Sequence, residues 1–90
     1  MAERNDKHIE EFEKRLVALR TTFDLYFSGL ERIPPVEELD KLKKLGLRLK
    51  AESGRWSTAD KFKMNSLAQK LTTFSQMWEK ELAAMENGTS

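Results

Sequence analysis

The apolar residues in the first third of the chain recur at alternating intervals of three and four positions. This spacing places them on one face of an α-helix, in the heptad pattern of coiled coils, whereas a strand would need alternation of period two. Asn5 or Asp6 can cap the start of such a helix, and Pro34-Pro35 prevents its continuation. We therefore predict a helix over about residues 6–32. Its apolar face consists of Ile9, Phe12, Leu16, Leu19, Phe23, Tyr26 and Leu30.

Two further helical patterns follow. Pro35 suits the first turn of a helix, and acidic residues come early and basic residues late, as the helix dipole favours, so we predict a second helix over about 35–53. Its end is marked by Ser53-Gly54, where Gly54 can adopt the left-handed conformation of a helix cap. Ser57 and Asp60 form the start signal of a third helix over about 57–86. The apolar stripe of this helix is Met64, Leu67, Leu71, Phe74, Trp78, Leu82 and Met85.

These patterns predict an all-α fold in which three helices form one antiparallel bundle or coiled coil. Connections of a few residues make consecutive helices antiparallel. A chain of 90 residues supports one core, so we predict a single domain over 1–90, with 1–5 and 87–90 disordered. Such a domain buries only about 60–65% of its unfolded surface, which favours a partner. In an alternative arrangement the first and third helices open and pair with those of a second chain.

The second helix carries more apolar residues than one neighbour requires. Its leucines and valine spread over an arc of roughly 200°, and Leu25 points away from the apolar face of the first helix. Two neighbours within a bundle would explain most of this arc, and a partner contact through Leu25, Leu45 and Leu47 would use the remainder. Trp56, at the corner between the second and third helices, either closes the end of the bundle or anchors a partner. Closure is the favoured use of an indole at that place.

Charge is distributed unevenly along the chain. The net charge of +1 conceals a segment, 41–70, with nine basic and two acidic residues between two acidic flanks. This segment is a candidate surface for the phosphates of nucleic acid or anionic lipid, or for an acidic partner. Alternatively, the segment is a solvated face that complements the acidic first helix. The second interpretation is favoured because Trp56 and Phe62 offer little aromatic surface for base stacking. The candidate anion-binding residues are Lys41, Lys44, Arg48, Arg55, Lys61 and Lys63.

The residue content argues against an enzyme. The chain has no cysteine, which excludes thiol catalysis and cysteine-ligated zinc, and His8 is its one histidine. The four glycines form no phosphate loop, and the early carboxylates belong to a solvated helix start. We therefore predict no catalytic, cofactor-binding or metal-ligating residue. The apolar runs are far shorter than the roughly 20 residues that span a bilayer, so we expect no membrane insertion and a cytoplasmic location.

Three short sequence motifs, taken together and in order, resemble a known protein region. They are Tyr26-Phe27-Ser28-Gly29 leading to Pro34-Pro35, then Thr58-Ala59-Asp60-Lys61-Phe62-Lys63, then Trp78 and Gly88-Thr89. Together they resemble an uncharacterised helical region that recurs in bacterial proteins, notably those of deltaproteobacteria. Ser57 stands where that region has Asn. Lys61 and Lys63 replace its arginines, and lysine cannot reproduce the bidentate contact of an arginine side chain. The resemblance implies a helical interaction module without an assigned activity, and for Gly29 a close helix contact beside Tyr26.

Two functions are compatible with these features. The first is a non-enzymatic module for oligomerisation, as a homodimer for example, or for interaction with another protein. The second is electrostatic binding of nucleic acid or another anionic ligand through the basic segment 41–70.

Overall fold

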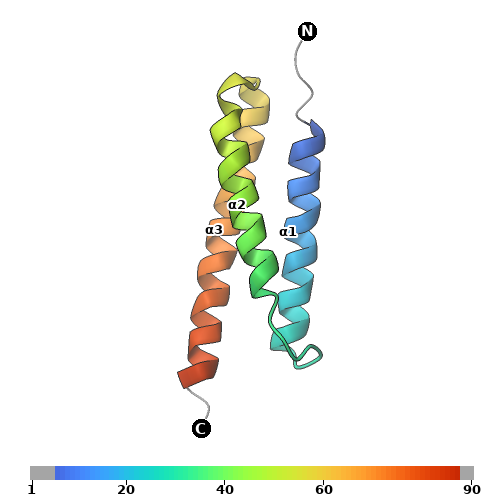
Figure 1. Ribbon diagram of the computed structural model, residues 1–90, viewed down its shortest axis with the longest axis vertical. Helices are drawn as coiled ribbons and strands as arrows, with labels where there is room; N and C mark the ends of the chain where they lie inside the picture. Colours follow the sequence, from blue (N-terminus) through green and yellow to red (C-terminus); the bar gives the residue numbers. More distant parts are fainter. Residues whose placement is uncertain (1–5, 88–90) are drawn as a thin grey trace.

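The computed structural model describes residues 6–87, which form three α-helices that pack against one another (Figure 1). Helix α1 spans Asp6–Phe27, α2 spans Val36–Glu52 and α3 spans Thr58–Asn87, and a 3-10 helix, η1 (Ser53–Arg55), joins α2 to α3. The described residues contain no strand, so the predicted all-α three-helix bundle is confirmed. The expected disorder at 1–5 and 88–90 lies outside the described residues, while Asn87 belongs to α3.

The bundle is a rod in which α2 runs antiparallel to both neighbours, and α1 and α3 run in the same direction (Figure 1). Its extents are 58 × 19 × 17 Å. At 1.5 Å per residue, the 22, 17 and 30 residues of α1, α2 and α3 correspond to lengths of about 33, 26 and 45 Å. Because α3 is the longest helix, part of its length lies beyond the reach of α2.

The core is formed by the predicted apolar stripes of α1 and α3 and by one side of α2. Every helix contributes side chains that are almost fully buried, so the three elements share one continuous core. Leu45, on the side of α2 next to α1, is partly buried against this core. The buried apolar residues are Ile9, Phe12, Leu16, Leu19, Phe23, Leu39, Leu42, Leu49, Trp56, Met64, Leu67, Leu71 and Trp78.

Aromatic rings dominate one half of this core. The ring of Phe23 stacks on Trp78 with centroids 4.3 Å apart, and Phe74 stacks on the same indole at 5.5 Å. The guanidinium of Arg20 lies 5.3 Å from the Phe74 centroid, so a cation from α1 covers the outer side of this group. Phe23 and Trp78 are almost completely buried, and their contact fixes α1 against α3 at this level of the rod.

Helix α1 ends at Phe27, not at residue 32 as predicted. Gly29 has a φ of +88°, the Leu30 N–H donates to the Leu25 carbonyl (2.9 Å), and the Gly29 N–H donates to the Tyr26 carbonyl (3.1 Å). These two hydrogen bonds form a Schellman motif, which satisfies the last carbonyls of a helix and turns the chain away. Consequently Leu30, expected on the apolar face of the helix, is 75% exposed.

The glycine that permits close helix packing is Gly46, whereas the contact inferred for Gly29 from the resemblance is wrong. A Cβ at Gly29 would have no atom within 4 Å. A Cβ at Gly46, in the middle of α2, would lie 3.1 Å from Cε2 of Phe12 and 3.9 Å from Cδ2 of Leu71. Gly46 therefore lets the ring of α1 rest against the backbone of α2, with α3 close by.

The corner between α2 and α3 is closed by Trp56, which is 7% exposed. The Trp56 N–H donates to the Ser53 carbonyl (3.0 Å), and Ser57 Oγ accepts the Asp60 N–H (3.2 Å) as the predicted N-cap. The left-handed conformation expected for Gly54 is wrong, because α2 continues into η1 with right-handed dihedral angles at Ser53. The indole therefore closes the end of the bundle.

Replacing Gly46 with leucine should destabilise the bundle. The new side chain would collide with the buried Phe12 ring, and overpacking of this kind lowers the free energy of unfolding by about 1–3 kcal/mol. The matched control is Gly54→Leu, where a Cβ meets no atom within 4 Å. Urea unfolding followed by far-UV circular dichroism measures both variants. Equal stability of the two would contradict the close contact at Gly46.

Replacing Gly29 with alanine should also lower stability, by about 1–2 kcal/mol, because alanine is strained at positive φ. Gly29→Asn should cost less, since asparagine visits this region more readily. Thermal unfolding of the two variants compares them directly. If alanine were tolerated as well as asparagine, the left-handed turn after α1 would be refuted.

Candidate functional site

The four residues predicted to contact a partner do not form one surface. Trp56 is buried in the bundle, and Leu25 and Leu45 are half-buried. Leu47 is 71% exposed and lies at the edge of the groove between α2 and α3. Of the predicted set, Leu47 alone is therefore freely accessible.

A different group of apolar side chains is exposed at the end of the rod where α1 connects to α2. Leu30 and Ile33 of this connection are 75% and 78% exposed, and Val36 and Met85 are 49% and 44% exposed. We call these four residues the apolar end. Soluble proteins seldom expose several large apolar residues together without a function for them.

The apolar end results from the unequal helix lengths. Val36 begins α2 and Met85 lies in the last turn of α3, and both line a hollow of about 520 Å³ together with Tyr26, Pro34 and Leu82. Met85 continues the core stripe of α3, but α1 has already ended at Phe27. The stripe therefore runs past its neighbours in the bundle and remains accessible.

The predicted anion-binding residues separate into two groups. Lys41, Lys44 and Arg48 of α2 surround a shallow hollow of about 400 Å³ together with Leu45 and, from α1, Arg15. Arg55 lies in η1, and Lys61 and Lys63 lie on α3, outside this hollow. We call the surface lined by Arg15, Lys41, Lys44 and Arg48 the basic groove.

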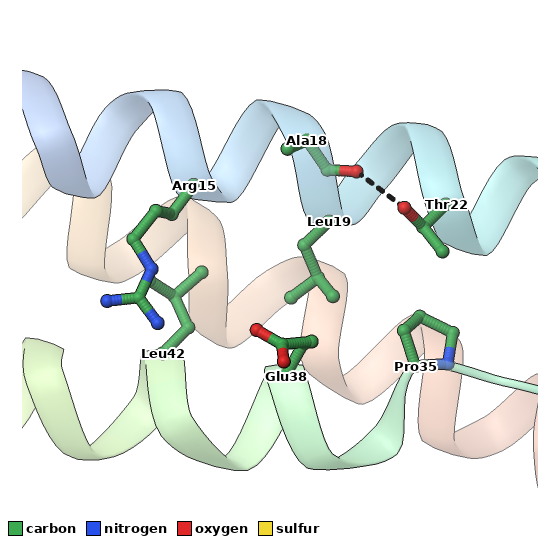
Figure 2. Close-up of a pocket in the computed structure, with 7 residues that line it drawn as sticks. All are labelled: Arg15, Ala18, Leu19, Thr22, Pro35, Glu38 and Leu42. Carbon is green, nitrogen blue, oxygen red and sulfur yellow. Dashed lines mark hydrogen bonds between the residues drawn. The ribbon is translucent and has the colours of Figure 1, made fainter.

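A second hollow continues the basic groove along the same two helices. Arg15 lines both hollows, and Figure 2 shows its side chain extending from α1 toward Leu42 of α2. Thr22 donates its hydroxyl proton to the Ala18 carbonyl (3.0 Å), so this donor is used within α1. Leu19 also lines this stretch. The floor is therefore mainly apolar, and the charged groups lie along its edge.

The acidic residues of α1 do not neutralise the basic groove through ion pairs. Among the described residues, no salt bridge joins α1 to α2 or α3. Lys41 pairs instead with Glu38 (3.7 Å) and Lys44 with Asp40 (3.1 Å), both within α2 and both exposed. Exposed pairs of this kind hold their partners weakly, so these lysines remain available to an external anion.

One polar network links α2 to α3. Lys43 Nζ lies 2.6 Å from Glu79 Oε2, and the Ser75 hydroxyl donates to the same oxygen at 3.2 Å. The hydrogen bond from Lys43 is the main cause that holds the pKa of the Glu79 carboxyl below its ordinary value. Every buried side-chain N or O atom of the described residues has a hydrogen-bond partner. The network therefore serves to pair two helices.

Residues 6–87 contain neither a candidate metal site nor a candidate membrane span. They contain no group of three or more His, Asp or Glu side chains that could hold a metal ion. His8 is exposed near the start of α1. Among the same residues, no helix has the length and apolar character needed to cross a membrane.

Comparison with protein-family models, curated proteins and solved structures finds no match to this chain. The resemblance to a deltaproteobacterial helical region therefore stays a prediction.

The Lys43–Glu79 pair should contribute to stability in a pH-dependent manner. Because the folded state lowers the pKa of Glu79, the contribution is present above the unfolded-state pKa and is lost as the pH falls through the folded-state value. A double-mutant cycle with Lys43→Met and Glu79→Gln should give a coupling of about 0.2–1 kcal/mol at neutral pH, since both side chains are about half exposed. A coupling that persisted unchanged in acid, once Glu79 is protonated, would contradict this account.

Proposed function

We propose that this chain is a non-enzymatic helical module for oligomerisation or protein–protein interaction, and that the apolar end is its contact surface. The observation that carries the proposal is the exposure of Leu30, Ile33, Val36 and Met85 at one end of the bundle.

Burial of these side chains supplies a driving force for association. Covering one large apolar side chain stabilises a complex by about 1.5–3 kcal/mol before the costs of association are subtracted. Ile33 and Leu30 are accessible over three quarters of their surface, and Val36 and Met85 over nearly half. Several such groups at one end of the rod can therefore form the centre of an interface.

A second copy of the chain is the simplest partner. Most homodimers pair the same patch on both subunits about a two-fold axis, and an end of the rod can meet its own copy in this way. The accessible stripe of α3 would then continue against the partner helix, in the manner of a coiled coil. A bacterial origin and a cytoplasmic location also belong to this proposal, and the motif resemblance supports the bacterial origin.

Charge introduced at the apolar end should weaken association. We expect the mass measured by light scattering to rise above that of one chain in the high micromolar range. Leu30→Glu combined with Ile33→Glu should weaken this association at least about tenfold, because two carboxylates would have to leave water.

The matched control is Leu47→Glu combined with Phe62→Glu. It changes the charge equally, at positions that are 71% and 72% exposed but lie away from the apolar end. A wild-type chain that remains monomeric at high concentration would contradict self-association. Loss of association in the control but not in the Leu30 and Ile33 variant would assign the interface to another surface.

A further inference from the structure

We infer that the basic groove is a docking site for an acidic amphipathic helix of a partner protein. This site lies between α1 and α2 and is separate from the apolar end, so it does not depend on the proposed function.

The length of the groove matches a short helix. The basic groove and the hollow that continues it share Arg15, and together they extend from Pro35, just before α2, to Arg48. Thirteen steps of 1.5 Å separate these two residues, so the line is about 20 Å long, which corresponds to between three and four turns of a docked helix. Two antiparallel helices form its walls, as in bundles that accept a fourth helix.

The groove floor offers apolar contacts to such a helix. Ala18 is exposed, and Thr22, Pro35 and Leu45 are half-buried, so each can be covered further. A partner with small or branched apolar side chains at every third and fourth position would place them along this line. This mixture of an apolar floor and a charged edge is the complement of an amphipathic helix.

The charges select an acidic helix over a basic one. Arg15, Lys41, Lys44 and Arg48 present four cations, against which Glu38 and Asp40 provide two carboxylates. Both carboxylates are held in exposed pairs with the lysines, so partner carboxylates can replace them. Charges at the edge of an interface steer encounter and orient the partner.

The same surface offers little to the bases of single-stranded nucleic acid. No aromatic residue lines the two hollows, so bases would have no ring to stack on. Phe62, the large aromatic side chain exposed at 72%, lies on α3 outside the groove.

The test uses the full chain and three fluorescein-labelled probes measured by anisotropy. The first probe is an alanine-based peptide of about 14 residues, with leucines at heptad spacing on one face and glutamates beside them. The second probe has lysines in place of the glutamates, and the third is a duplex DNA of about 20 base pairs. Lys44→Glu combined with Arg48→Glu alters the groove, and Lys61→Glu combined with Lys63→Glu is the charge-matched control on α3.

We expect the acidic peptide to bind more tightly than the other two probes. Its affinity should fall at least about tenfold between about 50 mM and 500 mM salt, and about tenfold in the Lys44 and Arg48 variant. The affinity of the Lys61 and Lys63 variant for the acidic peptide should stay within about twofold of that of the unaltered chain. The inference would be overturned if the acidic peptide showed no saturable binding, or if the lysine peptide bound as tightly as the acidic one. It would also be overturned if the Lys61 and Lys63 variant lost as much affinity for the acidic peptide as the Lys44 and Arg48 variant. Tighter binding of duplex DNA that depends on Lys44 and Arg48 would assign the groove to nucleic acid instead.

Discussion

The contact between the Phe12 ring and the backbone of Gly46 is the constraint on which the rest of the bundle depends. The fully buried Phe12 ring lies 3.1 Å from the place that a Cβ at position 46 would take, and Leu71 of α3 lies 3.9 Å from the same place. All three helices therefore meet at one level, and the register of α1 against α2 follows from it. That register brings Arg15 beside Lys41 and Arg48 and so creates the basic groove. The chemistry of the surface is thus a consequence of a contact in the interior.

The sequence predicts the helices and most of the core well, because burial imposes the apolar spacing that can be counted along the chain. It predicts the end of α1 poorly, since the two prolines conceal the earlier stop at Gly29. The close helix contact that the resemblance implies for Gly29 fails because a glycine signals either a turn or a close approach, and Gly29 forms a left-handed turn. The position of Gly46 in the middle of a helical pattern between leucines was the signal for close packing.

The candidate surfaces were predictable only in part. The basic character of 41–70 is visible in composition, and three of the six predicted residues do line one groove. The contribution of Arg15 could not be predicted, because it depends on the register of α1 against α2. The same limitation applies to Lys43 and Glu79, which are distant in sequence and paired in space. The exposed set at the apolar end follows from helix lengths, and the difference between the predicted end of α1 at about residue 32 and its observed end at Phe27 was enough to hide it.

The parallel direction of α1 and α3 has a mechanical consequence. The start of α1 and the end of α3 lie at opposite ends of a rod whose longest extent is 58 Å (Figure 1). A tensile force applied at these two points acts along the helix axes and loads the contacts between helices in shear, so that many side-chain contacts resist it together. Bundles whose first and last helices run in opposite directions are instead opened from one end, one contact at a time. A pull along the rod is therefore opposed by the combined helix–helix contacts of the bundle.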